Sequence, residues 1–216
     1  FYDIDEFNRP ACIVYNATGS QQIKLENRDV IGIEEIITTL NDDDETCLKV
    51  CGYMHGKYVE RMVTDEDAIK VLGTMKKGDF AAVLFDVVTN YITKAEFYMT
   101  SDPNRFDRDY YINNHTSAEE GSFHKGMLVA RVKDSTKQMI SLNGDSKTMT
   151  TVIAPDGNYR EGDSFRRNGG YTIYDCEEKK FIYGAFFDEL EKNDLICAST
   201  AKNLMYSFVV LRNCKF

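Results

Sequence analysis

The sequence has no tryptophan, three prolines and three histidines among 216 residues. It also has no apolar run near the roughly 18 residues that a membrane-spanning helix needs, so we expect no membrane insertion. The histidines His55, His115 and His124 do not have the spacing of metal ligands. Zinc chemistry of the His-x-x-x-His kind is therefore excluded.

Motifs that identify common enzyme classes are also absent: there is no Gly-x-Ser-x-Gly elbow, no P-loop and no dinucleotide-binding glycine pattern. The segment Asp102–Asp109 comes closest to a calcium loop, but Phe106 occupies a ligand position and Arg105 adds positive charge. We predict no cofactor and no metal, and we favour binding over catalysis. A secreted hydrolase whose site combines dispersed carboxylates and histidines stays an alternative, because a sequence does not show which residues meet in space.

The cysteine content indicates the secretory route. Six cysteines, an even number, extend from near the start of the chain to near its end, and sequons for N-glycosylation occur at Asn16 and Asn114. Position 1 is Phe rather than Met, as in the mature part of a precursor that has lost a signal peptide. We expect a secreted glycoprotein with three disulfide bonds formed by Cys12, Cys47, Cys51, Cys176, Cys197 and Cys214. The alternative is a cytosolic protein whose thiols pack as small hydrophobes.

Charge is distributed unevenly along the chain. The net charge is −9, and residues 1–70 contain 15 acidic against 7 basic side chains. Such a chain has no electrostatic reason to bind phosphate backbones, so we expect no nucleic acid and predict a basic protein or a cationic small molecule as partner. The predicted binding surface is acidic and contains tyrosines: Asp42, Asp43, Asp44, Glu45, Asp107, Asp109, Tyr110 and Tyr111. The alternatives are a surface that only confers solubility and a β-barrel carrier of a small apolar or amine ligand.

The pattern of apolar residues predicts an α+β fold, with a mainly antiparallel β-sheet, as a sandwich or barrel, and two helices in the N-terminal third. We expect a single domain over residues 1–216. The first helix is predicted from Asp29 to Leu40, because Val30, Ile33, Ile36, Ile37 and Leu40 recur every three or four positions. The second is predicted over Asp65–Lys77, with Thr64 as its cap and Gly78 as its left-handed stop.

A hairpin is predicted over Cys47–Val63, with His55-Gly56 as its two-residue turn. Alternation places Leu48, Val50, Met54, Val59 and Val63 on the core side. Tyr53, Tyr58 and the two cysteines of the hairpin then share the other face, which we expect to be covered. Further strands are predicted at Ala11–Tyr15, Gln22–Leu25, Phe80–Val88, Tyr91–Met99, Met127–Val132, Gln138–Leu142, Met149–Ile153, Tyr171–Tyr174, Phe181–Gly184, Leu195–Ala198 and Met205–Leu211.

Overall fold

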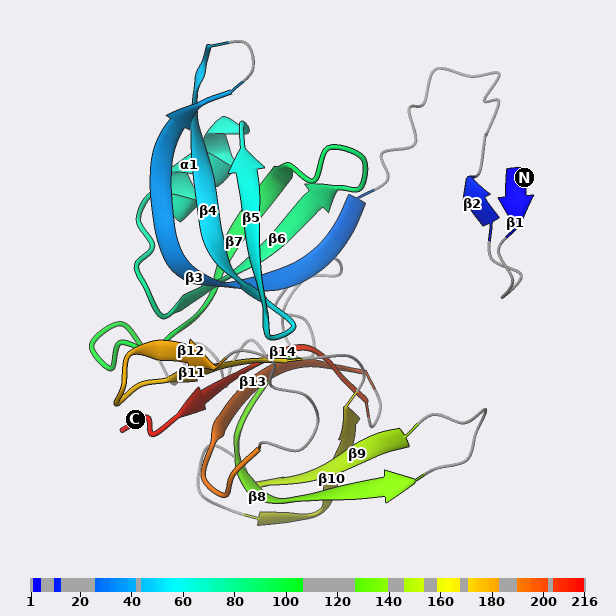
Figure 1. Ribbon diagram of the computed structural model, residues 1–216. Coiled ribbons are helices and arrows are strands. Elements are labelled where there is room, and N and C mark those ends of the chain that lie inside the picture. The colour runs from blue at the N-terminus through cyan, green and yellow to red at the C-terminus, as the bar shows by residue number, and fades with distance from the viewer. Residues whose placement is uncertain are drawn as a thin grey trace.

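The computed structural model describes residues 2–4, 10–12, 26–41, 44–106, 127–139, 146–153, 159–167, 171–182, 190–201 and 204–215. These residues form fourteen strands and one helix, arranged mainly as two barrels (Figure 1). The prediction of a mainly antiparallel β fold with a barrel is confirmed, and the prediction of two helices is wrong. No helix among these ranges is long and apolar enough to cross a membrane.

The first barrel consists of five strands in the closed order β3-β4-β5-β7-β6. Their bounds are Glu26–Leu40 (β3), Thr46–Met54 (β4), Lys57–Val63 (β5), Asp79–Asp86 (β6) and Ile92–Thr100 (β7). The ring closes by an antiparallel pairing of β3 with β6 and by a short parallel pairing of β5 with β7 at Val63 and Ile92. Its interior is filled by side chains that include Ile31, Val50, Val63, Leu72, Val83 and Ile92.

The strand β3 replaces the first predicted helix. Its apolar spacing imitates a helix for two reasons. A register shift between Ile33 and Glu35 moves the later side chains to the other face, so Ile31, Ile33 and Ile36 all contact the interior of the barrel. Val30, on the opposite face, is buried in a second cluster. The many β-branched residues of this segment favour a strand, and tertiary burial decides the outcome.

The helix α1, Glu66–Leu72, joins β5 to β6 and packs Ala68 and Leu72 against the interior of the first barrel. Its N-cap is Asp65 rather than Thr64, because Asp65 Oδ1 accepts hydrogen bonds from the backbone N–H groups of Asp67 (3.1 Å) and Ala68 (2.9 Å). The helix is shorter than predicted and ends at the cap residue Gly73. Gly78 does have a left-handed φ of 85°, but it lies in the turn that leads into β6.

The second barrel repeats the pairing order of the first. Its strands are Met127–Met139 (β8), Ser146–Ile153 (β9), Tyr159–Arg167 (β10), Leu195–Ala201 (β13) and Leu204–Arg212 (β14). β8 pairs with β9 and β9 with β10, both antiparallel; β10 pairs with β14 in parallel; and β14 pairs with β13, which returns to β8. β10 was not predicted, because its sequence YREGDSFRR has few apolar residues. β1 (Tyr2–Ile4) and β2 (Pro10–Cys12) form a separate antiparallel pair.

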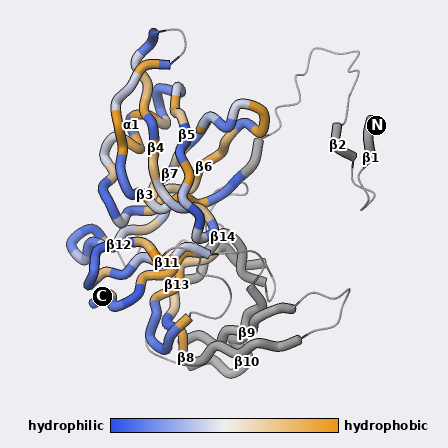
Figure 2. The backbone as a smooth tube through the Cα atoms, viewed as in Figure 1, coloured by the Kyte–Doolittle hydropathy of each residue, from blue (hydrophilic) through white to orange (hydrophobic). Residues whose placement is uncertain are grey.

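A hairpin of β11 (Thr172–Asp175) and β12 (Lys180–Ile182) lies between the barrels, and β11 pairs in parallel with β14. Phe181 and Tyr174 of this hairpin share one buried cluster with Val30, Phe80 and Tyr98 of the first barrel. Hydrophobic positions gather on β6, β7, β11 and β13 (Figure 2). The two barrels therefore pack against each other through this shared core, which is a separate cluster from the interior of the first barrel.

Candidate functional site

The hairpin of β4 and β5 positions the candidate site. His55 and Gly56 both have positive φ, 49° and 70°, as the predicted two-residue turn requires. Gly56 donates a backbone hydrogen bond to Thr172 Oγ1 (3.2 Å), which fixes the tip of the hairpin against the second barrel. The predicted assignment of faces is confirmed, because Leu48, Val50, Met54, Val59 and Val63 all belong to the interior cluster.

The outer face of the hairpin carries a row of aromatic rings. Tyr53 and Tyr58 are directly opposite each other in the register and meet edge to face with centroids 5.6 Å apart. On its other side Tyr53 stacks on Phe181, with centroids 4.8 Å apart and planes inclined by 24°. The row begins in solvent, where Tyr58 is 47% exposed, and ends in the core between the barrels. The expectation that this face is covered is therefore correct at Tyr53 and incorrect at Tyr58.

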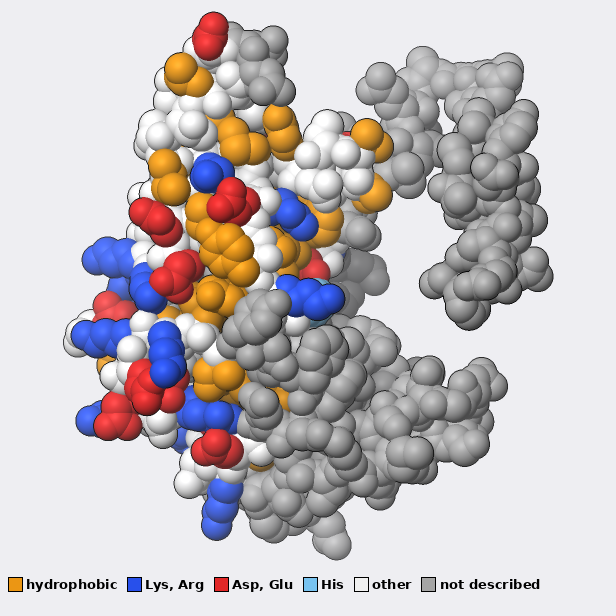
Figure 3. All heavy atoms as spheres, viewed as in Figure 1, with side chains coloured by type: hydrophobic (Ala, Val, Ile, Leu, Met, Phe, Trp, Pro, Cys, Tyr) orange, Lys and Arg blue, Asp and Glu red, His pale blue; other side chains and the backbone are white. Residues whose placement is uncertain are grey.

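Polar groups hold Tyr58 across the strand pair. Its hydroxyl donates to Glu60 Oε1 (3.2 Å), and hydrogen bonding to Cys51, with burial and the charge of Glu60 adding to it, raises the pKa of this phenol. Lys49 forms a solvated ion pair with Glu60 (3.2 Å). Figure 3 shows hydrophobic side chains over β4 and β5 bordered by Lys, Arg, Asp and Glu. The exposed ring of Tyr58 therefore lies beside the solvated charges of Lys49 and Glu60.

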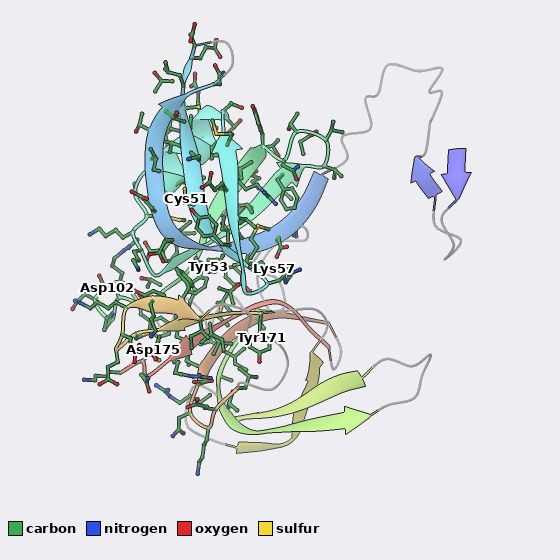
Figure 4. All side chains as sticks on the ribbon, in the orientation of Figure 1. Cys51, Tyr53, Lys57, Asp102, Tyr171 and Asp175 are labelled. Carbon is green, nitrogen blue, oxygen red and sulfur yellow. The ribbon has the colours of Figure 1, made fainter. Side chains whose placement is uncertain are left out.

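The inner side of the same hairpin opens into a cavity of about 400 Å³. Lys57 lies at the end of the hairpin next to the second barrel (Figure 4). The cavity is lined by Asp29, Met54, His55, Lys57, Val59, Arg61 and Phe85. His55 Nε2 contacts Asp29 Oδ2 at 2.6 Å. Arg61 donates to the backbone oxygen of Glu60 (3.0 Å) and lies 5.6 Å from the centroid of the Phe85 ring, while its Nε is buried with no hydrogen-bond partner.

Only two residues of the predicted acidic surface, Asp44 and Glu45, belong to the described part of the chain, so this surface stays a prediction. Asp44 and Glu45 are exposed in the turn between β3 and β4, where Asn41 Oδ1 accepts from the N–H of Glu45 (2.8 Å). The other predicted binding residues lie outside the described residues: Asp42, Asp43, Asp107, Asp109, Tyr110 and Tyr111. Asn16 and Asn114 also lie outside them, so glycosylation and secretion stay predictions.

The predicted disulfide bonds are not present among the described cysteines, because none of Cys47, Cys51, Cys176, Cys197 and Cys214 is in a disulfide bond. Cys47 and Cys51 cannot pair with each other, since four residues along one strand separate them by about 13 Å. Cys197 is fully buried, which raises the pKa of its thiol. Of Cys12 only the backbone, in β2, is described. Three of these thiols, those of Cys47, Cys51 and Cys197, therefore act as buried apolar groups.

Among the described residues no group of His, Cys, Asp and Glu could hold a metal ion. Two charged networks there are structural. Buried Asp79 accepts from Arg105 (2.6 Å) and from the Thr100 hydroxyl (2.7 Å). Buried Asp194 accepts from Arg212 (3.0 Å). Both carboxylates have their donors within the fold and stabilise turns rather than offering a site.

The strand order of the first barrel, with a helix between the third and fourth strands and a parallel contact between the third and fifth, decides the fold type. This barrel fits an OB fold. In OB folds the face of the second and third strands is the ligand-binding face, and here those strands are β4 and β5. The aromatic row and the cavity are therefore on the two sides of the strand pair that this fold uses for binding.

No protein-family model matches the chain, and no curated protein matches it. Solved structures to which it is similar include the tetrameric p202 HIN2 domain (10% identity, 88% of each chain, TM-score 0.25). A replication protein A heterotrimer bound to single-stranded DNA matches at 9% identity over 93% of this chain and 52% of that one, with TM-score 0.25. The Ifi202 HINa domain in complex with 20-base-pair double-stranded DNA matches at 9% identity over 88% and 92%, with TM-score 0.22. These likenesses are weak, and the strand pairings above stand without them.

Two sequence-based predictions are corrected here. The prediction that the partners include no nucleic acid is corrected, because the first barrel fits an OB fold, a fold that includes oligonucleotide-binding domains, and the net charge alone does not exclude such a partner. The prediction of a protein that binds basic partners through an acidic, tyrosine-bearing surface is corrected for the same reason. The error came from applying the net charge to the whole surface. The hairpin Cys47–Val63 has three basic side chains, Lys49, Lys57 and Arg61, against the single acid Glu60.

Sequence reasoning also missed the site itself. Alternation did put Tyr53 and Tyr58 on the face opposite the core, which was the available signal. We took the apolar character of that face to mean burial under another part of the chain. In the structure the β11–β12 hairpin covers Tyr53, through Phe181, and leaves Tyr58 in solvent.

Proposed function

We propose that the chain binds single-stranded nucleic acid across the outer face of β4 and β5. The observation that carries the proposal is the exposed ring of Tyr58, set against Tyr53 on the second and third strands of an OB-type barrel. OB folds bind oligonucleotides on this face. A fold does not define a function by itself, so the side chains must supply the chemistry.

The chemistry required is base stacking together with charge neutralisation. A base that stacks on an exposed aromatic ring gains about 1–3 kcal/mol, and any base can do so because each has a π-face. Lys49 lies on the same face as the aromatic pair and can reach a phosphate, since its ion pair with Glu60 is solvated and costs little to exchange. The site thus suits a flexible single strand whose bases are free to turn outward.

The net charge of −9 sets a limit on affinity. Long-range repulsion opposes the approach of a polyanion, so we expect weak binding that depends on stacking more than on charge. With about one phosphate neutralised by Lys49, the affinity should fall with salt at a logarithmic slope of about −0.7. A strongly basic nucleic-acid-binding domain would show a much steeper slope.

The test is fluorescence anisotropy with a labelled oligothymidylate of about 15 nucleotides, a length that covers one OB-type site. Tyr58→Ala should raise the Kd by at least about fivefold, which is the change that a loss of about 1 kcal/mol produces. Tyr58→Phe is the matched control, because it keeps the ring and removes only the hydroxyl, and should bind like the original chain. Equal binding by the alanine and phenylalanine variants, or no binding at about 100 μM protein, would refute the proposal.

A further inference from the structure

The cavity on the inner side of β5 has features that stacking on the outer face does not use. Its volume of about 400 Å³ falls in the range of small-molecule sites, roughly 300–1,000 Å³. Its apolar wall comes from Met54, Val59 and Phe85, and its cationic groups are those of Lys57 and Arg61. An apolar wall beside two cations matches a ligand with an apolar body and an anionic group.

Arg61 adds an independent observation. Its Nε is buried and has no hydrogen-bond partner, although a buried donor that is left unpaired costs about 1–3 kcal/mol, and more when the group is charged. Within the described part of the chain, Nη1 of this guanidinium donates to the backbone oxygen of Glu60, and the guanidinium lies against the Phe85 ring. A ligand oxygen in the cavity would give this donor an acceptor. Phosphate oxygens suit guanidinium groups best, because they accept paired, charge-assisted hydrogen bonds.

The cavity also limits how a strand could enter it. Met54 and Phe85 belong to the interior cluster of the barrel, so the floor of the cavity is the core itself. A polymer cannot pass through and can enter only by an end. Asp29 is the one carboxylate in the lining, and both its oxygens are engaged: Oδ1 accepts from the N–H of Val30 (2.7 Å) and Oδ2 contacts His55. The two cationic side chains of the lining, Lys57 and Arg61, outnumber this one carboxylate, whose oxygens already have partners.

We propose that this cavity binds a nucleotide that carries a phosphomonoester, with the base or sugar against Met54, Val59 and Phe85 and the phosphate on Arg61 and Lys57. Such a nucleotide is either the phosphorylated end of the strand on the outer face or a free mononucleotide. The first source rests on the proposed function. Tyr58 and Lys57 are adjacent on β5 and point to opposite sides of it, so one strand could continue from the ring to the cavity.

The experiment compares labelled oligothymidylates with a 5′-phosphate, a 3′-phosphate or hydroxyls at both ends, and adds a calorimetric titration with thymidine monophosphate against thymidine. A phosphorylated strand should bind about tenfold more tightly than the hydroxyl strand. Arg61→Gln and Lys57→Gln should each remove most of that preference, whereas Lys49→Gln should weaken all strands equally. Lys70→Gln, on the exposed side of α1, is the control that should change neither quantity. Thermal melts show whether the Arg61 variant is folded, and exposed Lys57 provides a second, milder variant.

The outcomes separate the two proposals. A preference for a phosphorylated end that Arg61→Gln removes supports the cavity as a strand-end site. Binding of thymidine monophosphate that depends on Arg61, with no binding of any strand, supports the cavity as a mononucleotide site and refutes the proposed function. Strand binding without preference for phosphate, together with no binding of the mononucleotide, overturns the cavity proposal and leaves the proposed function intact.

Discussion

Gly32 is a position where one added carbon should disturb the packing between the two barrels. A Cβ placed there would lie 2.5 Å from Phe181 Cε1 and 3.0 Å from Phe80 Cε1, closer than side-chain carbons approach. The Phe181 ring cannot turn away easily, because it stacks on Tyr53 and meets Tyr174 edge to face at 4.8 Å. Gly32→Ala is therefore an overpacking mutation, with an expected cost of about 1–3 kcal/mol in the free energy of unfolding.

The reason for that cost can be isolated by shortening the opposing side chain. Phe181→Leu removes the ring atoms that the new methyl group would meet, at a cost of its own from lost packing. The double variant should then be more stable than the sum of the two changes predicts, by about 1 kcal/mol or more. Leu72→Ala serves as the control partner, because Leu72 packs in the interior cluster of the first barrel and not in the shared core.

Urea denaturation followed by circular dichroism measures the free energy of unfolding of the original chain, of each single variant and of each double variant. Coupling is expected between Gly32→Ala and Phe181→Leu, and additivity between Gly32→Ala and Leu72→Ala. A stability unchanged by Gly32→Ala, or additivity within about 0.5 kcal/mol for the first pair, would show that the barrels do not pack through these two residues.

Three further outcomes are expected. Leu72→Ala should lower the free energy of unfolding by about 2–5 kcal/mol, because Leu72 is fully buried. Lys76→Ala should change it by less than about 0.5 kcal/mol, because Lys76 is exposed. Equal effects of the two substitutions in a denaturation series would contradict this prediction. Burial, and then the neighbouring Cys214 and Asp175, raise the pKa of Cys176 to about 12. Iodoacetamide at pH 8 should therefore label Cys176 far more slowly than it labels a cysteine in a short peptide. Rapid labelling, detected by mass spectrometry, would contradict the raised pKa. For Asp175, burial opposes ionisation, but hydrogen bonds from the Glu178 N–H, the Asn213 amide and the Glu177 N–H outweigh it and lower the pKa. The ionised carboxylate should therefore stabilise the fold above the pKa of the unfolded chain, and this stabilisation should be lost as the pH falls below about 4. Asp175→Asn should flatten that part of a profile of stability against pH.

The parts of the fold that follow local rules could be predicted from the sequence. The His55-Gly56 turn with alternating arms defined the first hairpin, and the strands predicted at Tyr171–Tyr174 and Phe181–Gly184 correspond to β11 and β12. The helix α1 was located, although its N-cap was shifted by one residue and its end by several. In each of these cases the pattern and the backbone requirement agree within a few residues.

The errors occurred where contacts distant in sequence decide the structure. β3 is buried on both faces near its start and contains a register shift, so its apolar spacing depends on the second barrel and on β4 rather than on its own backbone. β10 is held by pairing with β9 and β14 and lacks the apolar pattern of a strand. The aromatic row requires Phe181 beside Tyr53, and these residues are far apart in the sequence. No local pattern indicates such a contact.

The inserts between the third and fourth strands differ in the two barrels, and this affects how the molecule opens. In the first barrel α1 seals the interior of its own barrel, whereas in the second the β11–β12 hairpin extends into the shared core and pairs with β14. Amides on β6 and on β14 should therefore exchange with solvent deuterium through one common opening, whose free energy is that of global unfolding. A ligand bound at β4 and β5 would then slow exchange on β14 as much as on β6, although the ligand site is not on β14.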